Sequence, residues 1–338
     1  MALKGLGIMS KVFKDKYISV FIPTYNAKEY LADCVNAILS QELPVGYALE
    51  IIIIDSGSSD GTVEIIESYG DKINFIKIQK SQFGHGKTRQ YAAEIAKGDF
   101  ILYLTQDATP SNNRWIKNMI EPFFISDKIG CVFGRQMPRP NAIPTIKREI
   151  LTVFGNFGAP DSITLHRNKS LVDNYLMNTV NTFFSDVNSA IRKDLIKQIP
   201  IRDVRYAEDQ ALAQDMQAAG YLKAYSVQGS VWHSHNYSVR DFYKRKFDEY
   251  IGLQESVNYE IVPSIKLLLL GWIKPTIADL KFIRHDGEYG RKTKIKYIIL
   301  SFGYNFMSNL SKYHAGKYIN NPKMRQKISL ESSRKQQK

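Results

Sequence analysis

Cysteine is scarce in this chain of 338 residues, which contains only Cys34 and Cys131. These two residues lie far apart in apolar surroundings, without the paired spacing of a zinc site or a disulfide framework. We therefore expect reduced core side chains in a cytosolic protein. Residues 1–16 contain basic side chains but no apolar run long enough for a signal peptide, so we expect no export.

Long apolar runs are also missing, since a transmembrane helix needs about 20 consecutive apolar residues. Two shorter runs, residues 265–273 and 297–310, are flanked by lysines and include Trp272 and Tyr297. Such segments suit amphipathic helices that lie in a membrane interface. Ordinary helices packed on a catalytic domain fit the pattern equally well, so both interpretations stay open.

Acidic residues are outnumbered, with 33 Asp and Glu against 46 Lys and Arg and a formal net charge of +13. Much of the excess lies in the C-terminal third, which indicates an anionic partner. Nucleic acid and the inner leaflet of a membrane both attract clustered Lys and Arg. A solvated tail from residue 326 onward is the alternative.

Strand-like and helix-like segments alternate from residue 17 to residue 135. The pattern predicts an α/β fold with a mostly parallel central sheet flanked by helices. The first helix is expected at residues 27–41, with Asn26 as its N-cap and Glu29 completing a capping box.

The alternation breaks down after Gln136, where prolines and glycines predict a long excursion of residues 137–179 over the active face. A helix at residues 208–219 and strands at 222–227 and 230–235 follow. Composition changes again past Asn236. We therefore expect a catalytic domain at residues 17–236 and a mainly helical, basic region at residues 237–338.

Two expected strands end in carboxylates. Residues 51–54 are four isoleucines without alternation, so both faces of their strand should be buried. Asp55 then stands at the carboxyl end, which faces the ligand crevice in parallel sheets. Gly57 and Gly61 allow the backbone to bend there, and Asp60 is expected to cap the next helix. Asp107 follows the fourth strand in the same way.

A glycine-containing loop at residues 83–89 is a candidate phosphate site. Its glycines let backbone N–H groups approach an anion, and a helix that starts at Lys87 offers its positive end. Lys87 and Arg89 add charge. The leaving diphosphate of a nucleotide-sugar needs such neutralisation, usually with a divalent cation.

Two further motifs carry candidate chemistry. Glu208 and Asp209 open a predicted helix, where a carboxylate can act as a general base or only as a cap. His233 and His235 lie two apart on a predicted strand, so both should point to one face and either can bind a metal.

The chain resembles family 2 glycosyltransferases of the GT-A type in a series of motifs that follow the order of the family. These motifs are residues 21–26, 55–62, 85–89, 105–108, 208–209 and 233–235. The resemblance covers about residues 17–237 and is greatest to bacterial rhamnosyltransferases. It implies inverting transfer from a nucleotide-sugar, with Asp209 as the base and Asp107 on Mg²⁺ or Mn²⁺. By the same resemblance His233 or His235 completes the metal site.

The resemblance also implies a set of substrate-binding residues, in which Asp55 contacts the pyrimidine and Thr24 and Arg89 lie near the nucleotide. The full set is Pro23, Thr24, Tyr25, Asp55, Ser56, Lys87, Arg89, Gln106, Asp107 and Glu208.

The chain departs from the family at several points. The Asp-x-Asp motif reads Thr105-Gln106-Asp107, which leaves one carboxylate for the metal, and Ser56 replaces a second Asp. Membrane spans and the Gln-x-x-Arg-Trp motif of processive members are not found, which implies a single-addition enzyme.

The resemblance further implies dTDP-β-L-rhamnose as donor and a lipid-linked or oligosaccharide acceptor for bacterial surface polysaccharide. The expected location is cytoplasmic, peripheral on the inner face of the cell membrane, without nucleic acid as a partner. A nucleotidyltransferase of similar fold is an alternative, but residues 23–26 lack its Gly-rich signature. A non-catalytic basic protein that binds nucleic acid or membrane is the other, although it leaves Asp55 and Asp209 without a role.

Overall fold

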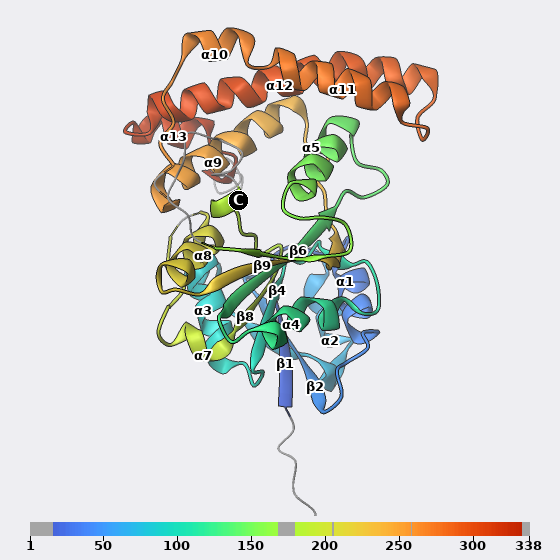
Figure 1. The fold of residues 1–338 in the computed structure, drawn as a ribbon, viewed down its shortest axis with the longest axis vertical. Coiled ribbons are helices and arrows are strands. Elements are labelled where there is room, and N and C mark those ends of the chain that lie inside the picture. The colour runs from blue at the N-terminus through green and yellow to red at the C-terminus, as the bar shows by residue number, and fades with distance from the viewer. Residues whose placement is uncertain (1–15, 168–179, 205, 258, 333–338) are drawn as a thin grey trace, which may run out of the picture.

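The computed structural model describes residues 16–167, 180–204, 206–257 and 259–332. A nine-stranded sheet forms the centre of the molecule, in the order β3-β2-β1-β4-β8-β6-β9-β5 with β7 paired to β9 (Figure 1). Its strands are β1 (Lys16–Thr24), β2 (Tyr47–Asp55), β3 (Asn74–Lys77), β4 (Phe100–Leu104), β5 (Thr109–Pro110), β6 (Ile129–Met137), β7 (Ile163–His166), β8 (Asn188–Arg192) and β9 (Leu222–Trp232). The expected α/β class is confirmed.

Six strands, β1, β2, β3, β4, β6 and β9, run in one direction, as their mutual pairings require. Strand β8 lies between β4 and β6 and runs against both. The short strands β5 and β7 pair antiparallel to β9. The amino end of β8 therefore lies at the edge where the parallel strands have their carboxyl ends.

Helices cover both faces of the sheet, and successive side chains of the central strands alternate between two apolar clusters. Ile51 and Ile53 belong to the cluster that contains α1 (Leu31–Leu39) and α4 (Trp115–Ile125). Ile52 and Ile54 belong to the cluster with α3 (His85–Ile95) and α8 (Glu208–Ala218). Both faces of β2 are buried, as the unbroken isoleucine run predicts. The short helix α2 (Thr62–Glu67) adds Ile66 to the first cluster, and α7 (Lys193–Ile196) adds Leu195 and Ile196 to the second.

The start of the first helix differs from the prediction. Helix α1 begins at Leu31 with Tyr30 as N-cap and no side-chain cap. Asn26 instead has a left-handed backbone (φ 50°), and its Oδ1 accepts a hydrogen bond from the N–H of Ser59. The Asn26 side chain stabilises the loop after β2, because the tertiary contact takes the oxygen that a cap would have used.

Two other predicted segments are also different. Residues 137–167 contain helix α5 (Pro144–Gly155) and strand β7, so this part of the excursion is not a structureless loop; residues 168–179 lie outside the described part of the chain. The two strands expected at 222–227 and 230–235 are a single strand, β9, which ends at Trp232. Its irregular pairing with β6 accommodates the apparent break.

A helical layer lies beyond the carboxyl edge of the parallel strands (Figure 1). It consists of α9 (Val239–Val257), α10 (Ile265–Leu270), α11 (Ile273–His285), α12 (Arg291–Tyr318) and α13 (Pro322–Ile328). Helix α5 packs on this layer through Ile146, which joins Phe242 and Tyr304 in one cluster. Because α5 contacts both parts, the division into residues 17–236 and 237–338 stays a prediction.

Other expectations concern the cysteines, the tail and membrane spans. Cys34 and Cys131 are buried and free. The chain after residue 326 is folded as far as residue 332, with Ile328 and Leu330 buried and Asp248 accepting the N–H of Leu330. No helix within the described residues combines the length and apolar character needed to cross a bilayer.

Candidate active site

The carboxyl ends of β1, β2 and β4 enclose a cleft of about 370 Å³, a size common for small-molecule sites. Its walls come from the loops that follow these strands, from the segment after β3 and from the start of α3. The lining residues are Pro23, Thr24, Tyr25, Ser56, Lys80, Phe83, His85, Arg89, Thr105, Gln106 and Asp107. Seven of the ten predicted substrate-binding residues are in this set; Asp55, Lys87 and Glu208 are not.

Gln106 connects two walls of the cleft. Its Oε1 accepts the N–H of Tyr25 at 2.7 Å and its Nε2 donates to the carbonyl of Tyr25 at 3.2 Å. Thr24 in turn donates its hydroxyl to the carbonyl of Ile54. These bonds hold the ends of β1, β2 and β4 in fixed relative positions, so the cleft is preformed.

Asp55 does not line the cleft; it precedes the lining residue Ser56 and fixes the turn that follows β2. One carboxylate oxygen accepts the N–H groups of Gly57 and Ser58, both at 2.9 Å, and the other accepts the Ser58 hydroxyl. Gly57 has φ 95°, so the turn needs the freedom of glycine that the sequence predicts. Asp60 is not the helix cap that the sequence predicts, because Gly61 is the N-cap of α2 and no side chain caps this helix. Asp60 instead accepts the N–H of Lys28 and of Thr62.

The predicted phosphate loop has a different structure. Helix α3 begins at His85 rather than Lys87, with Gly84 as N-cap. Gly86 is therefore inside the helix, where an added Cβ would lie 2.0 Å from the carbonyl oxygen of Arg202. This glycine allows close packing of two chain segments, which is a structural role. Lys87 is exposed and outside the cleft lining, whereas Lys80 lines it and lies over the Tyr25 ring.

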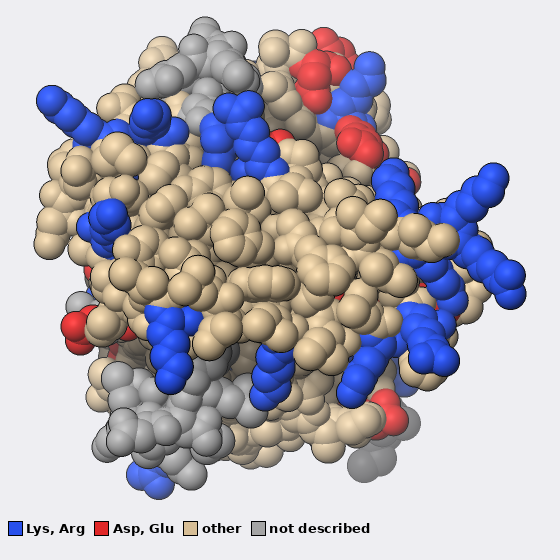
Figure 2. Space-filling model, turned by 90° about the horizontal axis from the view of Figure 1, so that it is seen from above, with Lys and Arg blue, Asp and Glu red and all other residues tan. Residues whose placement is uncertain are grey.

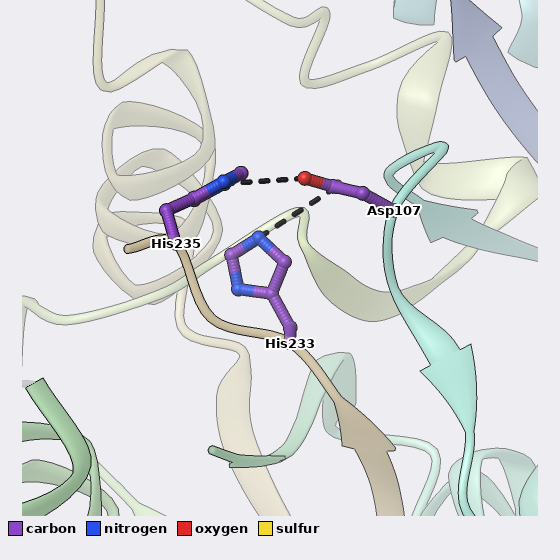
Figure 3. Close-up of side chains that lie close together, drawn as sticks. All are labelled: Asp107, His233 and His235. Atoms are coloured by element: carbon purple, nitrogen blue, oxygen red, sulfur yellow. Dashed lines mark ion pairs between the residues drawn. The ribbon is translucent and has the colours of Figure 1, made fainter. Parts of the chain in front are cut away.

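Asp107, His233 and His235 form one compact cluster, with ligand atoms within 4.8 Å of one another (Figure 3). The Nε2 atom of His235 lies 3.1 Å from Asp107 Oδ2, and that of His233 lies 3.6 Å from Oδ1. The two histidines follow β9 rather than belonging to it, so the predicted strand alternation is not what brings them together. They converge because this loop passes beside the loop after β4.

The donor set of this cluster fits a divalent cation. His233 Nδ1 lies 3.0 Å from Gln136 Oε1, which is the partner expected when the other ring nitrogen faces a metal. Burial lowers the pKa of His233 to about 4, so the ring is neutral, the form that binds metal. Burial opposes ionisation of Asp107, but the two imidazoles beside it hold its pKa below the ordinary value.

A second group of charged side chains is buried around Arg89, on α3. The guanidinium contacts Glu208 at 2.6 Å and Asp186 at 2.9 Å, and all three side chains are at most 7% exposed. Burial opposes the charge on Arg89, but these carboxylates raise its pKa. Arg89 therefore lies on the cleft wall with its charge balanced from behind. Glu208 contacts Arg89 and is not among the residues that line the cleft.

Asp209 is the neighbour of Glu208 at the start of α8. Its carboxylate accepts the N–H of Asp186 at 3.1 Å and that of Gln210 at 2.7 Å. Burial raises the pKa of Asp209 well above the ordinary value, and the Glu208 and Asp186 carboxylates act in the same direction. A carboxyl with a raised pKa is typical of groups that take up a proton during a reaction.

Comparison with known proteins gives a consistent result. The model of the family "Glycosyl transferase family 2" matches residues 19–199. The O-antigen chain rhamnosyltransferase RfbN of Salmonella typhimurium is 34% identical over 236 residues, which cover 68% of this chain and 70% of RfbN. WbaN of Salmonella anatum, also an O-antigen chain rhamnosyltransferase, has the same identity and coverage.

The chain belongs to glycosyltransferase family 2. Its resemblance to bacterial rhamnosyltransferases is confirmed, and it is a glycosyltransferase. Among solved structures, a mannosyltransferase of Pyrobaculum calidifontis in complex with GDP-Man and Mn²⁺ superposes with a TM-score of 0.56 at 14% identity, covering 88% of this chain and 86% of that one. This likeness confirms the GT-A fold.

Two residues near the site of this glycosyltransferase, Asp186 and Arg139, were not predicted from the sequence. Asp186 precedes β8, and only the reversed direction of that strand brings it to the carboxyl edge of the sheet. Arg139 follows β6 and donates to the backbone carbonyl of Asp107 at 2.6 Å. Neither residue is part of a motif, so no local signal in the sequence marks them.

Proposed function

We propose that this family 2 enzyme is an inverting glycosyltransferase that moves L-rhamnose from dTDP-β-L-rhamnose to a lipid-linked or oligosaccharide acceptor in bacterial surface polysaccharide synthesis. The donor class is supported by the similarity to the two Salmonella rhamnosyltransferases. The single observation that carries the reaction type is that the Asp107 cluster and Arg89, with the carboxylates behind it, meet at one preformed cleft.

In the proposed complex the nucleoside occupies the part of the cleft formed by the loops after β1 and β2. Pro23, Thr24, Tyr25 and Ser56 line this part, and Asp55 fixes the turn beside Ser56. Lys80 provides positive charge for the diphosphate, and Arg89 lines the same cleft with its charge balanced by Glu208 and Asp186. Lys87 is exposed and has no part in this proposal.

Asp107, His233 and His235 would hold a divalent cation, Mn²⁺ or Mg²⁺. Such an ion neutralises the charge that develops on a leaving diphosphate. Two imidazoles and one carboxylate suit Mn²⁺ better than Mg²⁺, which favours oxygen ligands. Asp209 would accept the proton of the attacking acceptor hydroxyl, and the backbone N–H groups of Asp186 and Gln210 fix the orientation of its carboxylate.

The acceptor in this proposal is held at the inner face of the cell membrane, and the enzyme is a cytoplasmic protein attached there peripherally. The basic character of the chain supports this location, because anionic lipids attract Lys and Arg.

A thermal-shift panel of dTDP-, UDP- and GDP-sugars, with and without Mn²⁺, tests the donor and the metal together. Ligands that bind the folded state raise its apparent stability by mass action. We expect the largest shift with dTDP-rhamnose and Mn²⁺, and loss of the Mn²⁺-dependent part in Asp107→Ala. Stabilisation by UDP- or GDP-sugars alone would refute dTDP-rhamnose as the donor. Thermal shifts that do not change with Mn²⁺ or with chelators would refute the metal site.

A further inference from the structure

Helices α10 and α12 expose large apolar side chains on the outer side of the helical layer. On α10, Ile265, Leu267, Leu269 and Leu270 are 54–64% exposed. On α12, Ile299 is 66% and Phe302 44% exposed. Contiguous apolar surface of this kind marks an interaction site in a soluble protein.

The polarity of α12 is the reverse of that in a helix that faces water. Its exposed apolar side chains stand at positions 295, 299, 302 and 306, a spacing that places them on one side. The buried side includes Ser301, Asn305 and Ser311. Asn305 donates to the buried carboxylate of Asp279, so the inner side combines polar contacts with the apolar packing of Tyr304 on Phe242. The sequence of α12 therefore fits an apolar medium on its outer side.

Positive charge surrounds this outer apolar face. Residues 262–306 contain eight Lys and Arg but three acidic residues. All three carboxylates contact basic side chains of α5, because Asp279 pairs with Arg148 while Asp286 and Glu288 pair with Lys147. Among the described residues, none of the eight basic side chains has a carboxylate partner within 4.0 Å. Seen from above, the helical layer shows a broad uncharged centre with Lys and Arg side chains projecting mostly at its edges (Figure 2).

We propose that the outer apolar face of α10 and α12, together with the exposed Ile273 and Ile277 of α11, docks on an anionic lipid bilayer, with its apolar side chains inserted between headgroups and its lysines on lipid phosphates. Amphipathic helices bind membranes in this way, lying in the plane of the interface. Helices α10 and α11 both pack along the long helix α12, so the three form one layer (Figure 1). This inference deepens the membrane attachment in the proposed function by naming the surface responsible.

A second copy of the chain fits this face less well. In a symmetric dimer the same patch meets itself, so the basic margins of two copies would lie against each other. Anionic headgroups neutralise the same margin, and each Lys or Arg near the surface raises the affinity for the membrane about fivefold.

Vesicle co-sedimentation of the full chain tests the proposal. We expect binding to phosphatidylcholine vesicles that contain phosphatidylglycerol, and weaker binding without the anionic lipid or at high salt. The triple variant Leu267→Ser, Leu269→Ser and Leu270→Ser should lose affinity by at least about a hundredfold, since one inserted leucine contributes roughly tenfold. Replacing Lys266, Lys274 and Lys281 by Gln should reduce binding to the anionic vesicles only.

The matched control is Val45→Ser with Ile125→Ser, since these apolar side chains are 102% and 57% exposed away from the helical layer. It should bind vesicles like the wild type. Because the changed side chains are exposed, all variants should keep the wild-type melting temperature. Equal vesicle binding by the leucine variant and the wild type overturns the proposal. The proposal is also overturned if the wild type does not bind anionic vesicles. Light scattering tests the alternative of a second copy. If the wild type is a dimer, the leucine variant is a monomer and both bind vesicles equally, the face binds a second copy and the membrane proposal is wrong.

The vesicle assay contains no sugar donor, so its outcome is independent of the reaction. The leucine variant should keep the wild-type thermal shift with dTDP-rhamnose and Mn²⁺. If the wild type does not bind vesicles but shows the thermal shift with dTDP-rhamnose, only the docking face is refuted. If the wild type binds vesicles but shows no thermal shift with dTDP-rhamnose, only the donor is refuted.

Discussion

Asp209→Asn is the substitution that tests the proposed base most directly. Asparagine keeps the size of the side chain and one oxygen acceptor for the N–H groups of Asp186 and Gln210. One of these N–H donors loses its acceptor, which lowers the free energy of unfolding by about 1–3 kcal/mol. The same change removes a carboxylate that lies beside Glu208 and Asp186, which relieves repulsion. The two effects oppose each other, so we expect a folded variant.

The expected effect on catalysis is large. A general base contributes about two to four orders of magnitude, which corresponds to about 3–5 kcal/mol of transition-state stabilisation. The variant should therefore bind the dTDP-sugar normally and transfer it about 100- to 10,000-fold more slowly. Thermal shift measures the first quantity, and product formation under saturating donor and acceptor measures the second.

The pH profile provides an independent test. A base acts only when deprotonated, so kcat should fall as the pH is lowered through the pKa of Asp209. Because burial and the neighbouring carboxylates raise that pKa, the fall should begin at a higher pH than for an ordinary aspartate. The residual activity of Asp209→Asn should lack this limb.

The control is Asp215→Asn on the same helix, whose carboxylate pairs with Arg202 away from the cleft. It should keep wild-type kcat and the acidic limb. Near-normal turnover in Asp209→Asn would refute the reasoning, as would an equal loss in both variants.

Three further changes test the rest of the site. Asp107→Ala should weaken dTDP-sugar binding in the presence of Mn²⁺ and leave metal-free binding unchanged in calorimetry; equal affinity with Mn²⁺ would exclude Asp107 as a ligand. Arg89→Met leaves Asp186 and Glu208 buried without their cation and should lower the free energy of unfolding in urea by about 3–5 kcal/mol. Arg192→Met, at a surface pair with Asp127, should cost less than about 1 kcal/mol; similar losses in the two arginine variants would show that burial is not the cause. Gly86→Ala forces a Cβ against the carbonyl of Arg202 and should cost about 1–3 kcal/mol, whereas Gly155→Ala, with open space around it, should not destabilise the protein; a wild-type melting temperature for Gly86→Ala would contradict the packing role.

Features that depend on neighbouring residues could be predicted from the sequence. The run of isoleucines at residues 51–54 specified a strand buried on both sides, because unbroken apolar character needs cover on each face. Carboxylates after β2 and β4 could be placed at the sheet edge, since parallel strands bring their ends together. The helix starting at Glu208 was also predicted correctly.

Roles within the site were harder to predict. Gly86 suggested a phosphate loop, yet it is a helical residue at a close contact with the segment around Arg202, about 116 positions later in the chain. Arg89 lines the cleft, but the two carboxylates that balance its charge come from distant segments. Sequence spacing carries no information about such partners.

The sequence by itself determined most of the strands and helices between residues 17 and 135, because side-chain periodicity and backbone preference act over a few residues. Only the tertiary structure decided that β8 runs against its neighbours and delivers Asp186 to the active edge, and that the loop after β9 carries His233 and His235 to Asp107. It also decided that the apolar residues of α10 and α12 face outward. Strand order, strand direction and the side of a helix that packs inward depend on contacts between residues far apart in the chain, which local preferences do not specify.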